Sequence, residues 1–509
     1  MKKFLTILGL AMVANTGVIY AQYAGDALRF SQTNYGSSAR FKGLGNAQTS
    51  LGGDISSIGG NPAGLGMFTR SEFSITPEFN NTGSKSNYFG QNSNDTKNSF
   101  NLNQAGIVWY NPVIRPKGSN LDQGIVSFVW GIGYNRNNDY SQRVSFAGKN
   151  PNNSLGDYFA EQANNTGQTH QNLPVGLGQL GYDNFLINET SPGVYQKANS
   201  KLNNNQAYNQ NRWGSTSEFN FAGSMNISNQ VYIGASIGFV TMHYDYDSNF
   251  SEMGSLTSTP QELPADPKVG DTYTASYLQS QTTRGNGING RIGIIYKPIN
   301  EFRIGASFQT PTWMHVEDTY SEAVNTRYNP GNSAYRPDQN NYVFQYTLRT
   351  PMKTSVGASL IIAGNGLLTG DVDFVNYSSI KLSTTSDYNT TDDRSILNNN
   401  NQDVKDFYKS AVNFRVGGEY KIDPITLRAG FGLNGTPYKQ DPDNQAQVKY
   451  YSAGLGYRIN QYYVDLAYQR VETNQTFVPY TVGTDASLDP TATTKLSKNN
   501  VFLTFGVRF

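Results

Sequence analysis

The last eleven residues, Asn499-Asn500-Val501-Phe502-Leu503-Thr504-Phe505-Gly506-Val507-Arg508-Phe509, carry the pattern that decides the fold. Every second residue from Val501 to Phe509 is apolar, whereas the residues between them include Thr504, Gly506 and Arg508. Side chains alternate between the two faces of a β-strand, so this segment is predicted to be a strand whose faces meet different surroundings.

The same alternation recurs through the chain, for example on both sides of the Ser228-Asn229-Gln230 turn. It predicts an all-β fold of about 14 antiparallel strands. They are expected near residues 70–80, 99–111, 124–145, 215–227, 231–248, 272–297, 302–319, 342–363, 367–377, 411–421, 424–435, 449–459, 462–471 and 499–509. The third and sixth are longer than a membrane needs, and we expect them to kink or to continue above it.

Short and long connections alternate between these strands. The short ones are residues 228–230, 298–301, 364–366, 422–423 and 460–461, with a moderate one at 112–123. The long polar ones are residues 81–98, 146–214, 249–271, 320–341, 378–410, 436–448 and 472–498. Short periplasmic turns and long outer loops are typical of a transmembrane β-barrel, whereas a secreted β-sandwich, the alternative, has no reason to keep this asymmetry.

The chain start predicts export. Lys2 and Lys3 precede an apolar run from Phe4 to Tyr20, which is too short and interrupted for a spanning helix but typical of a signal peptide over residues 1–21. The mature chain would then comprise a plug at 22–69 and a barrel at 70–509, whose longest loop, about 146–214, is expected to form a partly ordered helical cap.

Composition agrees with a barrel and excludes other classes. The chain has 34 tyrosines and 13% aromatic residues, and aromatic girdles are typical of outer-membrane barrels. Its net charge of +1 gives no indication of a nucleic-acid partner, and the absence of cysteine excludes disulfides and thiolate sites. The mean hydropathy of −0.53 does not argue against a membrane, because lipid-facing and lumen-facing residues average out.

Charged residues lie on the face opposite the apolar one. A charge at the bilayer midplane costs roughly 2–4 kcal/mol on the lipid side, so these residues are expected to face a lumen. They are Arg291, Arg303, Asp371, Asp373, Arg415, Arg428, Arg458, Asp465 and Arg508. The terminal Phe509 resembles the aromatic end that such barrels present to the barrel-assembly machinery, which is therefore a predicted partner together with outer-membrane lipid.

Residues 22–69 lack alternation but contain many apolar side chains. A flexible tail would expose them to water, so this segment is expected to fold inside the barrel. Within it, Ser38-Ala39-Arg40-Phe41-Lys42-Gly43-Leu44-Gly45-Asn46-Ala47 is followed by Asp54-Ile55-Ser56-Ser57-Ile58-Gly59-Gly60-Asn61-Pro62-Ala63-Gly64-Leu65. Over about residues 30–70 the chain resembles the plug, or hatch, of the long-chain fatty-acid transporter (FadL/TodX) family, and the barrel resembles that family in architecture only.

The resemblance implies a 14-stranded antiparallel transmembrane β-barrel in the outer membrane of a Gram-negative bacterium, closed by an N-terminal hatch in its lumen. It implies passive uptake of fatty acids or similar apolar molecules, which pass from an outer groove to a pocket beside the N-terminus and leave sideways where a kinked strand opens the wall. The hatch motif is Asn61, Pro62, Ala63, Gly64 and Leu65, and the region of the pocket holds Tyr23, Leu28 and Phe30.

Other functions remain open at this point. A receptor for haem-like ligands, a general porin and an adhesin are the alternatives to uptake of apolar compounds. The three histidines, His170, His243 and His315, are isolated in sequence, and pairs such as Asp371 and Asp373 fit a solvated lumen better than a calcium site. We therefore expect no enzyme activity, catalytic residue, metal site or cofactor.

Overall fold

The computed structural model describes residues 22–116, 118, 120, 122–198, 202–258, 268–329, 334–335, 340–441, 443–483 and 485–509. The predicted signal peptide, residues 1–21, lies outside the described residues. No helix among those described is long and apolar enough to cross a membrane.

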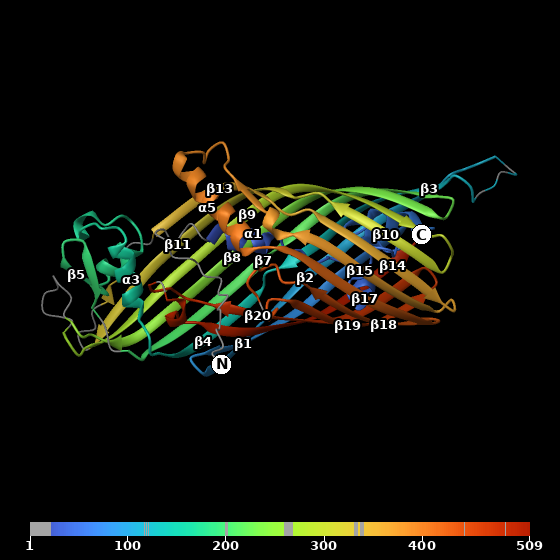
Figure 1. The fold of residues 1–509 in the computed structure, drawn as a ribbon. Helices are drawn as coiled ribbons and strands as arrows, with labels where there is room; N and C mark the ends of the chain where they lie inside the picture. The colour runs from blue at the N-terminus through green and yellow to red at the C-terminus, as the bar shows by residue number, and fades with distance from the viewer. Residues whose placement is uncertain are drawn as a thin grey trace.

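A closed β-barrel forms the body of the molecule (Figure 1). Its wall consists of β1 (Glu72–Tyr88), β2 (Gln91–Pro112), β3 (Ile125–Asp139), β4 (Gln142–Asn150), β7 (Asn204–Ile227), β8 (Val231–Ser255), β9 (Thr272–Tyr296), β10 (Phe302–Gln309), β11 (Trp313–Asn329), β13 (Asn340–Arg349), β14 (Lys353–Ile362), β15 (Gly366–Asn376), β16 (Lys381–Ser383), β17 (Ser410–Ile422), β18 (Ile425–Asn434), β19 (Val448–Ile459), β20 (Tyr462–Phe477) and β21 (Ala492–Arg508). The short β12 (Ala334–Tyr335) pairs with β11.

Closure comes from antiparallel pairing of the first strand with the last, from Glu72 opposite Arg508 to Tyr88 opposite Ala492. Short interruptions divide four wall strands into the pairs β3 with β4, β10 with β11, β14 with β13, and β15 with β16. Counted in this way the barrel has 14 strands, as predicted. Closure pairs the first strand with the last, so neither of them is a free sheet edge for lipid to meet.

The two faces of the wall divide as the sequence predicts. On the last strand Phe505 is 46% exposed on the outer face, whereas its neighbour Thr504 is fully buried on the inner face. Lumen-facing charges pair inside, as in Arg291 with Glu218 and Arg415 with Asp373, each at 2.6 Å. Arg303 and Arg458 form no ion pair among the described residues, and Arg458 is exposed at the end of β19 beside a short turn.

One predicted loop is wrong. Residues 81–98 form no long connection, because β1 and β2 continue as a paired hairpin to the two-residue turn Phe89-Gly90, where Gly90 has a φ of +80°. The outer face becomes polar above the apolar belt, so the alternation of apolar and polar residues ends before the strand does. Backbone pairing needs no apolar side chain, so the hairpin extends further. The polar stretch 472–498 likewise begins and ends as the strands β20 and β21.

The overlong third strand is interrupted between β3 and β4, and the overlong sixth, β9, continues unbroken for 25 residues. The predicted loop 146–214 is shorter, because β4 continues to Asn150 and β7 begins at Asn204. Residues 151–198 fold as a cap over the loop end of the barrel, with α3 (Leu155–Asn164), η3 (His170–Asn172), α4 (Leu177–Asp183) and a hairpin of β5 (Ile187–Ser191) and β6 (Val194–Lys197). The connection from β15 to β17 holds η4 (Tyr377–Ser379) and α5 (Thr391–Phe407), and the connection from β20 to β21 holds η5 (Ala486–Leu488).

Candidate functional site

The N-terminal segment, residues 22–71, runs inside the barrel before joining β1 (Figure 1). It comprises α1 (Gln22–Ser31), α2 (Ala39–Gly43), η1 (Ile55–Ile58) and η2 (Pro62–Met67). Most of its side chains are buried, including Phe41, Leu44 and Leu65 at 0% exposure. The segment therefore packs as part of the barrel interior rather than as a free tail.

The Asn-Pro-Ala triplet begins η2. Asn61 is the N-cap, and its side-chain oxygen accepts a hydrogen bond from the Ala63 amide at 3.1 Å. Pro62 stands at the first helical position, where its missing N–H costs nothing. The Asn61 amide also donates to the carbonyl of Thr49 at 2.6 Å, so the triplet holds two turns of the segment together.

The barrel wall is shaped to receive this triplet. Gly234 on β8 and Gly293 on β9 face Pro62 and Asn61, and a methyl group at either glycine would overlap them. Two of the remaining motif residues also make defined contacts: the carbonyl of Gly64 accepts from Gly53 N–H at 3.0 Å, and Leu65 packs in a buried apolar cluster. The hatch motif residues thus fix the segment's shape and its seat on the wall.

Polar contacts anchor the segment elsewhere. One carboxylate oxygen of Asp371, on β15, accepts from the Gln48 amide at 2.6 Å and from the Thr49 amide and hydroxyl at 2.8 Å each. Arg40 pairs with Glu419 on β17 at 3.1 Å. Other polar contacts join the segment to the wall, such as the Ala39 amide with the Thr504 hydroxyl at 2.8 Å, so the anchoring is spread over several sites.

The three predicted pocket residues meet in one apolar cluster around α1. The ring of Tyr23 lies 5.2 Å from that of Phe344 and 5.3 Å from that of Tyr346, both on β13. Phe30, at the other end of α1, lies 5.6 Å from Tyr244, and Leu28 is buried between them in sequence. The buried members are Tyr23, Ala24, Ala27, Leu28, Phe30, Tyr140, Val240, Met242, Tyr244, Met314, Val316, Phe344, Tyr346, Leu348, Val375, Tyr377, Ile380, Leu382, Leu397, Val404, Tyr408 and Ala411.

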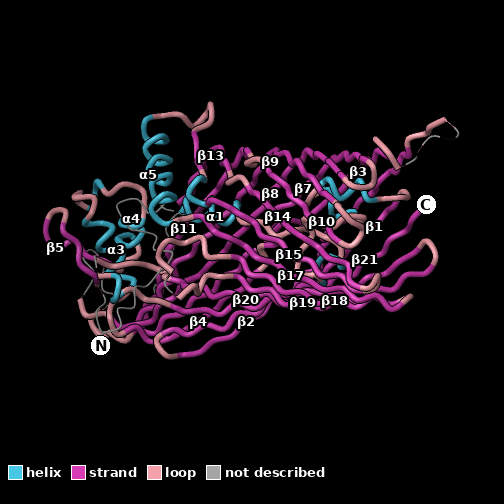
Figure 2. Tube along the Cα trace, turned by 45° about the vertical axis from the view of Figure 1, so that its right-hand side comes forward, coloured by secondary structure: helices cyan, strands magenta, loops and turns pink. Residues whose placement is uncertain are grey.

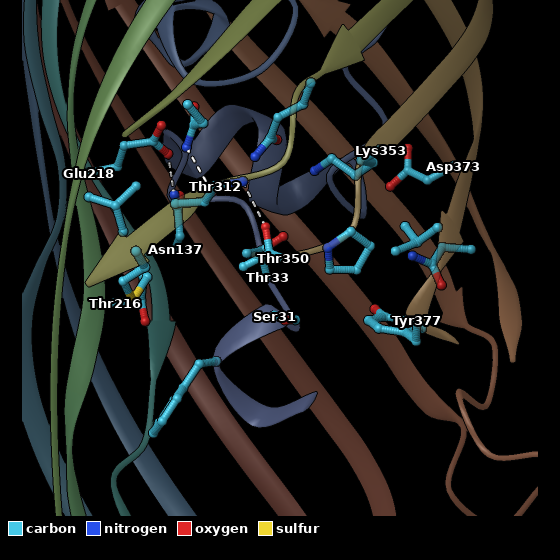
Figure 3. Close-up of a pocket in the computed structure, with 18 residues that line it drawn as sticks. Ser31, Thr33, Asn137, Thr216, Glu218, Thr312, Thr350, Lys353, Asp373 and Tyr377 are labelled. Carbon is cyan, nitrogen blue, oxygen red and sulfur yellow. Dashed lines mark hydrogen bonds between the residues drawn. The ribbon is translucent and has the colours of Figure 1, made fainter. Parts of the chain in front are cut away.

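A small polar cavity lies beside the end of α1 (Figure 3). Glu218 and Asn137 line one side, and Lys353 and Asp373 line the other. Its volume is about 30 Å³, whereas sites for drug-sized ligands hold roughly 300–1,000 Å³. A larger apolar molecule can enter this region only if α1 moves.

The barrel wall opens beside this cavity. β2 pairs with β3 only from Gln104 opposite Asn135 to Pro112 opposite Ser127. Beyond Asn135, β3 bends into the lumen, where the carbonyl of Asn137 accepts from the Asn34 amide at 2.7 Å. Among the described strands, the part of β2 before Gln104 therefore pairs with β1 alone, and we call this break in the β2–β3 ladder the gap.

Lys97 bridges this gap. Its ammonium group donates to the side chain of Asn211 at 2.6 Å and to the carbonyl of Arg212 at 2.7 Å, both on β7. It also lies 5.3 Å from the ring centre of Trp213. One side chain of β2 thus reaches past the bent third strand and closes the wall.

A family described as outer membrane protein transport protein (OMPP1/FadL/TodX) matches residues 190–509. The chain belongs to this family. FadL/TodX proteins are outer-membrane channels that transport hydrophobic compounds in Gram-negative bacteria, and they are not enzymes. The predicted family, location and non-enzymatic nature are therefore confirmed. The match lies in the barrel and does not include residues 30–70, which carry the resemblance in the sequence.

Solved structures of FadL/TodX proteins share the fold. A Pseudomonas aeruginosa FadL homologue is 14% identical, with 93% of this chain and 98% of that chain covered and a TM-score of 0.52. The P. putida toluene transporter TodX is 12% identical, with 94% and 99% covered and the same TM-score of 0.52. No curated protein sequence matches the chain.

Sequence reasoning missed the partners of α1 on the wall. Tyr244, Phe344 and Tyr346 lie at lumen-facing positions, and a search for large aromatic residues on that face would have found them. The bridging role of Lys97 has no such signal, because it depends on the inward bend of a different strand.

Proposed function

We propose that this FadL/TodX protein takes up long-chain fatty acids or similar apolar acids, with residues 22–69 as its hatch. The observation that carries the proposal is the apolar cluster around α1, which would become a binding pocket once α1 moves. Each CH₂ group buried there would contribute about 0.8 kcal/mol, which a water-filled pore cannot offer.

Lys353 supports an acidic ligand. It is half-buried in the cavity beside the cluster, and its ammonium group lies 4.0 Å from the ring centre of Tyr35. No salt bridge to it is found among the described side chains, whereas its neighbour Asp373 already pairs with Arg415. A ligand carboxylate at this cavity would therefore gain a charge-assisted hydrogen bond while its chain lies on the aromatic rings.

The gap between β2 and β3 supports a sideways exit. It lies beside the inward bend that contacts the hatch, so movement of the hatch would free the third strand. An apolar ligand leaving there reaches the bilayer without crossing water.

The test is uptake of radiolabelled oleate by cells that lack their own transporter and produce this chain or its variants. We expect uptake with the natural chain and a severalfold loss with Lys353→Met. Planar bilayer conductance should be negligible and should rise when residues 22–69 are deleted. A large steady conductance of the intact chain would favour a porin, and unchanged conductance after the deletion would refute the hatch.

A second ligand class is uncharged monoaromatic hydrocarbons. TodX, which shares the fold, is a toluene transporter, and the cluster around α1 is rich in aromatic rings. Lys353→Met separates the classes, because it would leave toluene uptake unchanged while reducing oleate uptake.

A further inference from the structure

One side of the barrel wall is low. The neighbouring strands β17, β18 and β19 have 13, 10 and 12 residues, whereas β7, β8 and β9 have 24, 25 and 25. Each of the six has one end at a short turn, and a strand rises about 3.3 Å per residue, so the low side ends roughly 40 Å sooner along the strand. Figure 1 shows the ends of these short strands near the middle of the barrel's length.

The helix α5 lies next to α1 (Figure 2) and packs on β16 and η4. It continues directly towards β17, and the loop after β18 holds its end: the Lys439 amide donates to the carbonyl of Phe407, and the Lys409 amide to the carbonyl of Pro437, each at 2.8 Å. The loop after β18 thus holds the C-terminal end of α5 beside the short strands.

Only a narrow stripe of α5 is buried. Leu397, Asn400 and Val404 are at most 2% exposed, and Leu397 and Val404 belong to the apolar cluster around α1. Most of the other side chains of the helix, including those of Asn398 and Asn399, face outward and are exposed. α5 therefore has one apolar side on the cluster and a polar side towards water and lipid headgroups.

Asn400 joins α5 to the start of α1. Its side-chain oxygen accepts from the Ala24 amide at 2.9 Å, and the Tyr408 hydroxyl donates to the Ala24 carbonyl at 3.2 Å. Amides in the first turn of a helix have no partner within that helix, so α5 satisfies a group that α1 cannot satisfy itself. The side chains of Asn400 and Tyr408 thereby hold α1 against α5.

The next residue joins α5 to the wall. The amide side chain of Asn401 both donates to the Leu382 carbonyl and accepts from the Leu382 amide, each at 2.8 Å, as a neighbouring strand would. Four successive asparagines, Asn398 to Asn401, thus divide into two exposed residues, one contact with α1 and one with β16.

We propose that α5 is the lid of the ligand's entrance. An apolar molecule comes in over the short strands β17 to β19, displaces α5, and first binds where Leu397 and Val404 leave the cluster. Displacement also removes the bonds of Ala24 to Asn400 and Tyr408, so arrival of the ligand releases α1. This inference rests on the proposed uptake function, and it adds the place where the ligand enters.

A reversible lock tests the lid. The chain has no cysteine, so the pair Ala24→Cys with Asn400→Cys joins α5 to α1 selectively. Oxidation should reduce oleate uptake at least tenfold relative to the same variant kept reduced, and a reductant should restore the rate of that reduced variant. A second lock, Leu382→Cys with Asn401→Cys, should act in the same way. Mass spectrometry confirms each cross-link, and a heat-dependent shift in gel mobility confirms the folded barrel.

Full uptake by cross-linked protein would overturn the lid while leaving the uptake function standing. Absence of uptake with the natural chain would instead refute the uptake function. Asn400→Ala removes one hydrogen bond from the lid, and we expect uptake about two- to tenfold faster. Its matched control is Asn399→Ala, one residue away and exposed. Equal rates for these two variants would also overturn the proposal.

Discussion

Asp371 is expected to control how often the hatch opens. The variant Asp371→Ala removes the acceptor of three hydrogen bonds from Gln48 and Thr49, and the amides it leaves lie in a buried region. Each orphaned buried donor costs about 1–3 kcal/mol. Part of this cost is offset, because water can enter the space and a carboxylate no longer has to be buried. We therefore expect the free energy that keeps the hatch seated to fall by about 3 kcal/mol.

The assay is single-channel recording in a planar bilayer. A loss of about 3 kcal/mol corresponds to a hatch that is open roughly a hundred times more often, seen as brief openings in an otherwise silent barrel. Asp371→Asn keeps one acceptor oxygen, so its opening frequency should lie between that of the natural chain and that of Asp371→Ala. Thr369→Ala is the matched control, because Thr369 faces the same lumen two residues away and its hydroxyl has no hydrogen-bond partner among the described residues. Openings as rare with Asp371→Ala as with Thr369→Ala would refute this reasoning.

Two other changes test the seat of the hatch and its exit. Gly293→Val should prevent Asn61 from seating on β9, because a Cβ there overlaps its side chain, and we expect steady conductance from a barrel that still folds. A silent channel would contradict this prediction. The control is Gly290→Val on the same strand, where a Cβ meets only ordinary contacts. Lys97→Met should remove the bridge to Asn211 and Arg212 and raise oleate uptake severalfold in an unchanged barrel. The control Lys85→Met, on the neighbouring strand β1, should leave uptake unchanged. Equal uptake by the two variants would show that Lys97 does not hold the gap closed.

The barrel could be predicted from the sequence because its cause is local. A strand between lipid and lumen must alternate, and residues 501–509 and 425–432 show this directly. The buried position of residues 22–69 followed from their apolar side chains, which had to be covered. The error at 81–98 has the same origin. Alternation occurs only where a strand crosses the lipid belt, so it does not show that the paired hairpin continues above the belt.

The candidate site was predictable only in part. Tyr23, Leu28 and Phe30 were expected near a pocket, and the structure places them in one cluster. Their partners come from strands more than 100 residues away, and no local pattern specifies which inward residue meets α1. The role of Asn400 could not be predicted either. It is one of four successive asparagines, and only their contacts in the folded chain distinguish them.

The proposed entrance and exit meet on a single rigid element. α1 has 10 residues, which is about 15 Å of helix. At its first turn Ala24 is bonded to Asn400 of the lid, and near its last turn Phe30 packs on Tyr140, where β3 gives way to β4 beside the wall gap. A rigid helix of this length can pivot about one end and keep its own hydrogen bonds, so release of Ala24 reaches Tyr140 only if α1 shifts as a whole. We expect such a shift when a ligand lifts α5, and entrance and exit would then be coupled through α1 without any energy source beyond binding. If this coupling holds, Phe30→Ala, which removes the ring contact with Tyr140, should reduce the gain in oleate uptake rate that Asn400→Ala produces. An undiminished gain would refute the coupling.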